Sequence, residues 1–248
     1  MPFEHHRISE WALKSIQAYK DLHFSNDDTD YSQGKTAEEI RAWLCGRISS
    51  DYNTPMSTER VNRLQENRLR TIYNNMRATH NLGSICKMTG DDLAITDTDK
   101  YCYIMTYSFP CQDLSVAGKG AGMAKESGTR SGLLWEVVRL LSECGSLPHV
   151  LIMENVPQVL STKNRPHFER LKSTLKEMGY SSEVGVLNAK DYGVPQNRKR
   201  CFMVSVPQGS VYAFPKATGC ELRLKDVLED DVDEKYYLTE NVLRVKEK

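Results

Sequence analysis

Residues 149–153 read HVLIM, and this run, followed by Glu154, decides the fold class. A short continuous apolar run is typical of a strand that is buried on both faces of a sheet. Apolar residues recur at helical spacing before it, over 131–142, and after it, over 165–178, where Gly179 provides a helix end. A buried strand between two helices is the repeating unit of an α/β protein.

The same alternation continues outward in both directions. Further strands are predicted at 101–106 (YCYIMT), 182–187 and 200–206, and a short strand at 5–9 runs directly into a helix over 10–22. Because strand and helix patterns alternate along the chain, we predict an α/β fold with a mostly parallel sheet.

The stretch 27–80 interrupts this alternation. After a polar, turn-rich loop, Thr36 and Glu39 form the signature of a capping box, and a long polar helix is predicted over 59–80. We therefore predict a helical insertion at 27–80.

The overall composition is that of an ordinary globular protein, with 40% hydrophobic and 27% charged residues. Lys+Arg and Asp+Glu both number 33, so any attraction to nucleic acid must come from a local patch. No apolar run reaches the roughly 20 residues that a membrane helix needs, and residues 1–6 do not resemble a signal peptide. We expect no membrane partner and a cytoplasmic location.

The cysteines and histidines indicate neither disulfide bonds nor a metal site. The seven cysteines are scattered, and no two form a CxxC pair, which favours reduced thiols in a chain without an export signal. The His5-His6 pair has no cysteine or acidic cluster at metal-ligand spacing, so no metal site is predicted.

Cys111 lies in a proline-containing turn after the 101–106 strand, within SFPCQDLS at 108–115. Active sites of open α/β sheets lie beyond the carboxyl ends of strands, so Cys111 is a candidate nucleophile. The alternative is a cysteine that fills the core as a small apolar side chain.

Two other segments carry polar residues at strand ends. Glu154 begins ENVP directly after HVLIM, where partial burial would suit it to donate a proton; the alternative is a cap or hydrogen-bonding strut. Arg198 and Arg200, in QNRKR at 196–200, should point to one face of an extended segment. Two guanidinium groups there could grip a phosphate or a base edge, unless they are a solvated strand end.

Together these segments resemble the DNA cytosine-5 methyltransferase family. FPCQ at 109–112 is similar to its nucleophile motif, ENV at 154–156 to its acidic motif and QNRKR at 196–200 to its QxRxR motif, in the family's order. Residues 128–136 fit the helix between the first two motifs. The resemblance covers about 1–25 and 84–240.

The resemblance implies a Rossmann-like methyltransferase fold that uses S-adenosylmethionine and acts on a cytosine flipped out of double-stranded DNA, as in restriction-modification systems. Cys111 would add covalently to cytosine C6, and Glu154 would protonate ring N3. Arg200 would contact cytosine O2, while Arg198 would brace the site.

It also implies binding residues. Glu10-Trp11 resembles the pair that holds the ribose hydroxyls and adenine face of the cofactor, and Gly90-Asp91-Asp92 the turn that meets the adenine amino group. The cofactor-binding candidates are Glu10, Trp11, Asp91, Asp92, Pro110 and Leu133. The DNA-binding candidates are Gln112, Ser115, Lys119, Lys125 and Gln196.

The sequence departs from the family in two places. The family opens with a strand and a glycine-rich turn for the methionine end of the cofactor, and continues after QxRxR into a target-recognition domain. We expect a split-enzyme subunit, a truncated gene product or a fragment, completed by a second polypeptide, in a bacterial or phage-infected cell. The expected units are a partial catalytic domain at 1–26 and 81–207, a helical insertion at 27–80, and a lead-in to a target-recognition domain at 208–248.

Two alternatives stay open. One is a catalytically inactive remnant that binds DNA or a partner. The other is a transfer-RNA cytosine-5 methyltransferase, which carries the same motifs.

Overall fold

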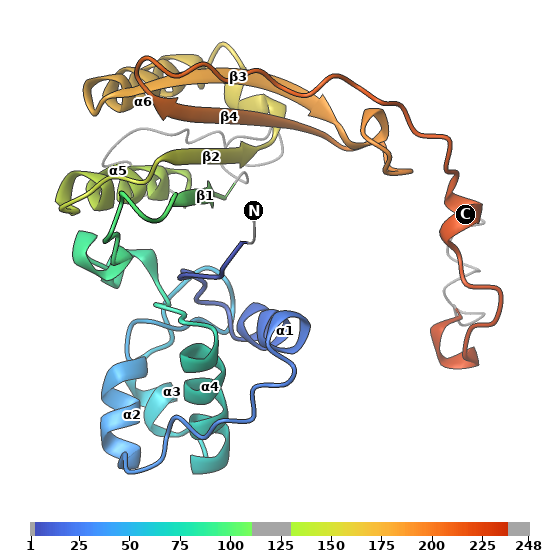
Figure 1. The fold of residues 1–248 in the computed structure, drawn as a ribbon. Coiled ribbons are helices and arrows are strands. Elements are labelled where there is room, and N and C mark those ends of the chain that lie inside the picture. The colour runs from blue at the N-terminus through green and yellow to red at the C-terminus, as the bar shows by residue number, and fades with distance from the viewer. Residues whose placement is uncertain (1–2, 111–129, 238–248) are drawn as a thin grey trace.

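A computed structural model of the protein describes residues 3–110 and 130–237. Within this part, four strands form one mixed sheet, and a group of helices lies beside it (Figure 1). The sheet order is β1-β2-β4-β3, in which β1 pairs parallel with β2 and the other two pairs are antiparallel. The strands are β1 Ile104–Ser108, β2 Val150–Asn155, β3 Tyr180–Asn188 and β4 Lys199–Pro207.

Four of the five predicted strands are present, but the prediction of a mostly parallel sheet is wrong for the described strands. The reason is the connection from β3 to β4, which spans only residues 189–198. Strands joined by so short a loop must run antiparallel, because a parallel pair needs a crossover of a dozen residues or more.

One face of the sheet is covered by two helices, α5 Leu134–Glu143 and α6 Arg165–Glu177. Alternate residues of the strands, such as Leu151 and Met153 of β2, pack with both helices in one core. The buried members are Phe109, Leu134, Val137, Leu141, Leu151, Met153, Val159, Phe168, Leu171, Leu175, Tyr180, Cys201 and Met203.

Strand β1 lies at the edge of the described sheet. Tyr103, just before it, donates its backbone N–H to His149 Nδ1 (3.0 Å), and its carbonyl accepts from the N–H of His149 (2.9 Å), so its backbone faces β2. Backbone groups alternate in direction along a strand, so those of Ile104, Thr106 and Ser108 face the open edge. The Ile104 side chain is 42% exposed.

The strand predicted at 5–9 is wrong, because this segment does not join the sheet. It forms a single bridge, from Ile8 to Asn81, and Leu82 donates its N–H to the Ile8 carbonyl at 2.9 Å. The turn at 79–83 therefore takes the backbone bonds that a sheet neighbour would need.

Four helices form a separate unit below the sheet in Figure 1. The prediction of one long helix over 59–80 is wrong, since the chain turns at Arg63–Gln65 and the Leu64 N–H bonds to the Val61 carbonyl at 3.1 Å. The break lets residues of both short helices enter one core. The helices are α1 Leu13–His23, α2 Ala37–Leu44, α3 Thr58–Asn62 and α4 Glu66–Ala78.

The core of this unit is formed by apolar side chains and Tyr73, and buried polar residues of the same unit include Ser32, Ser49 and Asn75. The capping box predicted at Thr36 is confirmed: its Oγ1 accepts from the Glu39 N–H, and the Glu39 carboxylate accepts from the Thr36 N–H. The core includes Ile16 of α1, so helix packing extends N-terminal to residue 27. The buried members are Ile16, Ile40, Leu44, Ile48, Met56, Val61, Leu69, Ile72, Tyr73 and Met76.

In the arm at 208–237, residues 208–219 run back along β3, where Phe214 lies against Gly185, and from about Gly219 to residue 237 the arm runs away from the sheet (Figure 1). Several of its large apolar side chains are exposed, from 50% at Leu222 to 95% at Val211. No helix in the described part is long and apolar enough to cross a membrane. Short 3-10 helices complete the fold: Ile85–Lys87, Gly90–Leu93, Arg130–Leu133, Pro157–Leu160, Ala189–Asp191, Leu224–Val227 and Glu234–Tyr236.

Candidate active site

The carboxyl ends of β1 and β2 meet where the sequence predicts the site. Ser108 and Glu154 are register partners on these parallel strands, and Ser108 Oγ lies 3.4 Å from Glu154 Oε2. The next residue, Asn155, donates its side-chain amide to the Phe109 carbonyl at 2.9 Å. Phe109 is itself buried in the sheet core, so the chain is fixed two residues before Cys111.

Glu154 forms an ion pair with Arg200, which lies on the antiparallel neighbour β4. Arg200 Nε is 2.8 Å from Glu154 Oε1, with the two side chains 23% and 35% exposed. Glu154 opposes Phe202 in the register, so Arg200 sits diagonally across on the same face of the sheet. The structure thus brings together two of the four predicted catalytic residues.

Arg198 lies just before β4. It is exposed, and its side chain forms no ion pair within the described residues, whereas Arg200 pairs with Glu154. Its backbone carbonyl accepts from the Ala189 N–H at 3.0 Å, which closes the loop between β3 and β4. The two-arginine fork stays a prediction.

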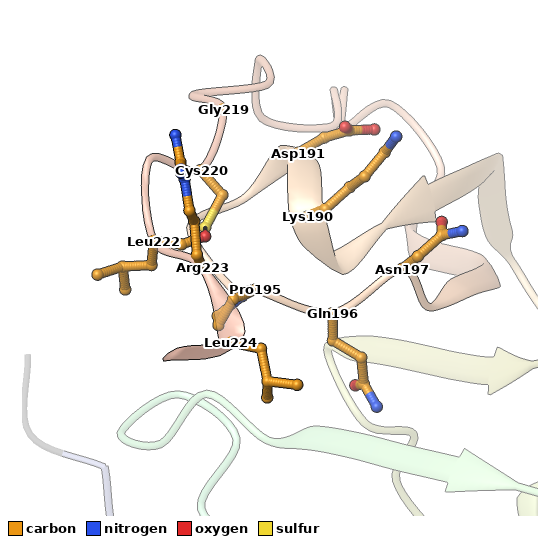
Figure 2. Close-up of a pocket in the computed structure, with 10 residues that line it drawn as sticks. All are labelled: Lys190, Asp191, Pro195, Gln196, Asn197, Gly219, Cys220, Leu222, Arg223 and Leu224. Carbon is orange, nitrogen blue, oxygen red and sulfur yellow. Dashed lines mark hydrogen bonds between the residues drawn. The ribbon is translucent and has the colours of Figure 1, made fainter. Parts of the chain in front are cut away.

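Gln196 lines a cavity of about 450 Å³ beside this loop. Figure 2 shows its side chain pointing away from Lys190 and Asp191, with Arg223 and Leu224 of the C-terminal arm on the opposite wall. The arm is tied here by backbone bonds from Thr218 (2.9 Å) and Gly219 (3.0 Å) to the Asp191 carbonyl.

Five predicted site residues lie outside the described residues. They are Cys111, Gln112, Ser115, Lys119 and Lys125. Pro110 is the last described residue before them and is half-buried.

The predicted adenosine-binding pair is located at the start of α1. Glu10 Oε1 accepts the Ala12 N–H at 2.6 Å, and the Glu10 N–H donates to Asn81 Oδ1 at 3.1 Å. The Trp11 carbonyl accepts from Ser49 at 2.7 Å, and the side chains of both residues are half-buried. Glu10 thus orders the first turn of the helix and leaves Oε2 without a partner among the described residues.

The Gly90-Asp91-Asp92 turn is held against the end of α5. Asp92 accepts from the Thr89 N–H (2.8 Å) and hydroxyl (3.0 Å), while the Asp91 side chain is exposed. A Cβ at Gly90 would come within 2.3 Å of the Cys144 backbone nitrogen, so only glycine allows this approach. Asp91 is therefore available for a ligand, and Asp92 is occupied as a cap.

Arg139 clamps the same turn to α5, a role that the sequence analysis missed. Its guanidinium pairs with Glu136 and Glu143 at 2.8 Å each and donates to the carbonyls of Ile85 (3.2 Å) and Met88 (3.0 Å).

Leu133 lies directly before the first residue of α5, whereas the Asp91 turn contacts its last residues. A ten-residue helix is about 15 Å long, so these two cofactor candidates are at opposite ends of α5.

Cys201 lies behind the ion pair, on the buried face of β4. Burial, and next the negative charge of Glu154, raise the pKa of the Cys201 thiol to about 11. This cysteine is therefore a neutral thiol near pH 7 and is not a competitor for the role of nucleophile.

Asn155 is the second functional position that the sequence analysis missed, although its motif was quoted. Its signal was the period-two alternation with Leu151 and Met153, which places an amide on the core face of β2. A polar group there must be hydrogen-bonded, and its partner turned out to be the nucleophile segment.

The comparisons with known proteins agree with this site. A family model described as C-5 cytosine-specific DNA methylase matches residues 53–248. Type II methyltransferase M2.ScrFI of Lactococcus lactis subsp. cremoris is 33% identical over 244 residues, covering 97% of this chain and 65% of the relative. Orphan methyltransferase M.SssI of Spiroplasma monobiae is 36% identical over 240 residues, covering 96% and 61%.

The chain thus spans less than two thirds of the length of these two relatives. Type II methyltransferase M.HhaI of Haemophilus parahaemolyticus is 36% identical over 131 residues, covering 52% of this chain and 38% of the relative. A solved structure of a Spodoptera frugiperda DNMT2 variant aligns with a TM-score of 0.50 at 22% identity, covering 73% of this chain and 54% of that one. This likeness shows that the fold is the Rossmann-like α/β fold of the methyltransferases.

The motifs, their meeting at the ends of β1, β2 and β4, and the matches over most of the sequence all indicate one assignment. The cofactor of this family is S-adenosylmethionine, as the sequence predicted. The chain belongs to the C-5 cytosine-specific DNA methylase family.

Proposed function

We propose that the protein is a DNA (cytosine-5-)-methyltransferase that transfers a methyl group from S-adenosylmethionine to C5 of a flipped cytosine. The observation that carries this proposal is the pairing of Glu154 with Arg200 beside the segment that leads to Cys111. An acid, a cation and a nucleophile turn at one sheet end are the groups that this chemistry needs.

The reaction runs through a covalent adduct. The Cys111 thiolate adds to C6 and forms a C–S bond, while the Glu154 acid gives its proton to ring N3. C5 then takes the electrophilic methyl group that bound S-adenosylmethionine would supply, as the methyl–sulfonium bond breaks and a neutral thioether is left. Loss of the C5 proton to a base re-forms the C5–C6 double bond and expels the Cys111 thiolate, and N3 returns its proton to the Glu154 carboxylate.

When the target cytosine enters the site, it must replace the contact between Glu154 and Arg200. In the described structure these two side chains satisfy each other at 2.8 Å. When cytosine enters, Arg200 can turn to the ring O2, and Glu154 can meet N3 as the acid. The ion pair therefore holds the site in order until the base replaces it.

The residues present suit the adenosine half of the cofactor. Glu10 has one uncommitted carboxylate oxygen for ribose hydroxyls, Trp11 has a half-buried ring, and Asp91 has an exposed carboxylate for an amino group. Pro110 and Leu133 would line the path toward the reacting centre.

The substrate is double-stranded DNA, from which the target base must be flipped to reach Cys111. Gln112, Ser115, Lys119, Lys125 and Gln196 would contact the DNA, and Arg198, exposed beside β4, would brace the closed site. The names of the bacterial relatives support a role in DNA modification, in a cytoplasmic setting.

A second polypeptide would complete the catalytic domain. The support is the open edge of β1, where three residues present unpaired backbone groups in the described sheet. A strand added there would satisfy them by main-chain hydrogen bonds. The arm at 208–237, with its exposed apolar residues, offers a second attachment, which suits a target-recognition domain.

Adduct trapping tests the proposed function. The full chain, reconstituted with the second polypeptide proposed above, is incubated with S-adenosylmethionine and duplex DNA containing 5-fluorocytosine, whose fluorine blocks the final elimination. We expect a protein–DNA adduct on a denaturing gel, lost in Cys111→Ala and retained in Cys220→Ser. An adduct that persists without Cys111, or its absence from the wild-type protein, would contradict the proposal. A 5-fluorocytosine transfer RNA that traps the protein instead would indicate the RNA-modifying alternative.

A further inference from the structure

A second cavity lies where the N-terminal segment crosses the end of α4, and its lining residue Asn81 accepts the N–H of the cofactor candidate Glu10. Its volume is about 330 Å³. In Figure 1 the N-terminal segment runs between the helical unit and the sheet. The lining residues are His6, Arg7, Arg77, His80, Asn81 and Leu82, so basic side chains form most of the wall.

The two arginines of this cavity have no acidic partner. Neither Arg7 nor Arg77 is within ion-pair distance of a carboxylate in residues 3–110 or 130–237, and both are exposed. By contrast, Arg70 of the same helix pairs with Glu66 at 2.7 Å. The guanidinium groups of the cavity are therefore available to an anion.

Helix capping does not account for Arg77. Cations near a helix C-terminus often bind its last carbonyls, but other groups already do so in α4. Thr79 Oγ1 donates to the Asn75 carbonyl at 2.8 Å, and the Asn81 N–H donates to the Met76 carbonyl at 2.7 Å.

The histidines are held in place by the protein. His80 Nδ1 donates to the His6 carbonyl at 3.0 Å, and His6 Nε2 donates to the Leu93 carbonyl at 3.0 Å. His80 also has a φ of +48°, a left-handed conformation that a non-glycine residue adopts at a cost. Each ring thus uses one nitrogen for the wall, and the other has no hydrogen-bond partner among the described residues.

We propose that this pocket binds a phosphate group of the DNA backbone, outside the site that takes the target cytosine. The proposal rests on the proposed DNA substrate. Planar guanidinium groups match phosphate oxygens in pairs, and the two guanidinium groups of this pocket form no ion pair among the described residues. Because the chain has 33 basic and 33 acidic residues, its DNA affinity must come from such local sites.

The first test uses inorganic phosphate and needs neither DNA nor catalysis. Phosphate is titrated into the full chain while the imidazole resonances of His6 and His80 are followed by NMR. We expect saturable shifts in the wild type, and their loss in the Arg7→Gln/Arg77→Gln double variant. Arg68→Gln, which removes another exposed arginine of α4, should keep them. Unchanged His6 and His80 resonances in the wild type would overturn the proposal that this pocket binds phosphate.

The second test measures non-covalent DNA binding at several salt concentrations. Each lost phosphate contact should lower the slope of log K against log salt by about 1, and the double variant loses the one phosphate of this pocket, so its slope should fall by about 1. Arg77→Lys keeps the charge and should retain the slope, and adduct formation at Cys111 should persist at low salt.

The outcomes separate this proposal from the proposed function. Adduct formation with an unchanged slope in the double variant would overturn the DNA contact alone. Phosphate-induced shifts with an unchanged slope would assign the pocket to a free phosphate compound instead. A slope lowered equally by Arg68→Gln would show a diffuse charge effect and overturn the pocket.

Discussion

At the scale of single residues, the proposed reaction depends on the ion pair between Glu154 and Arg200. Glu154 has two roles that compete, since it must hold Arg200 as a carboxylate and serve cytosine N3 as an acid. The adjacent Asn155 and Ser108 fix the strand ends around it. The geometry therefore ties proton donation to arrival of the base.

We predict that Glu154→Gln slows methyl transfer by about 10²-fold or more while DNA affinity changes little. A glutamine keeps the size of the side chain but cannot supply the proton that matters in the transition state. Single-turnover methylation and DNA binding, measured on the same protein, give the comparison. Glu183→Gln, an exposed site on β3, is the matched control. Equal losses of binding and turnover would mean that Glu154 is structural.

At the scale of elements, the 3-10 turn at Gly90–Leu93 depends on the end of α5. Gly90 lies so close to the Cys144 backbone that no side chain fits, and Glu143 accepts its N–H at 3.0 Å. Arg139 adds bonds to the preceding segment. The position of Asp91 is therefore set by a helix some fifty residues later in the chain.

We predict that Gly90→Ala destabilises the protein by about 1–3 kcal/mol, the usual cost of inserting a methyl group into a packed contact. Urea unfolding would measure the loss. Gly145→Ala, two residues after α5 and with nothing within 4 Å of its Cβ, should cost little. If Gly90→Ala and Gly145→Ala lowered the free energy of unfolding equally, the turn would be less constrained than the structure indicates.

Elements with a local cause were predictable from sequence. The capping box at Thr36, the strand after His149 and the helix ending before Gly179 all follow from residues a few positions apart. The failures have long-range causes. The segment 5–9 looks like a strand, yet its partner is the turn at 79–83, which no local pattern names.

The predictions for the candidate site can also be separated by what the sequence motifs alone determine. The positions of Glu154 and Arg200 followed from motifs at strand ends, and their ion pair confirmed that they meet. Arg198 lies one residue before β4 begins at Lys199, so the expectation that it shares a face with Arg200 stays a prediction.

At the scale of the whole molecule, the described sheet has an unpaired edge at β1, the strand that leads to the nucleophile turn. Among the described strands β1 pairs with β2 alone, and its residue Ile104 is 42% exposed.

We predict that the isolated chain binds S-adenosylmethionine more weakly than micromolar, and that a second polypeptide pairing with β1 restores binding and methylation. Calorimetry on the chain alone is the measurement. In the same sample, the amides of Ile104, Thr106 and Ser108 should exchange with solvent faster than those of Met105 and Tyr107. Thr106→Pro should block restoration, since it removes an outward N–H, whereas Thr106→Val should not. Micromolar binding without a partner would contradict the prediction.

The arm at 208–237 also determines how long the intact protein survives among proteases. Cleavage needs a stretch of chain that can be drawn into a protease without unfolding a core, and beyond Gly219 this arm has such a stretch. Its basic residues Arg223, Lys225 and Lys235 are exposed there, as trypsin requires. Both hydrophobic cores and the Glu154–Arg200 ion pair lie before residue 208. Cleavage in the arm would therefore leave these parts folded but remove the exposed apolar residues of the arm. A partner that covers the arm would thereby also set the lifetime of the whole chain.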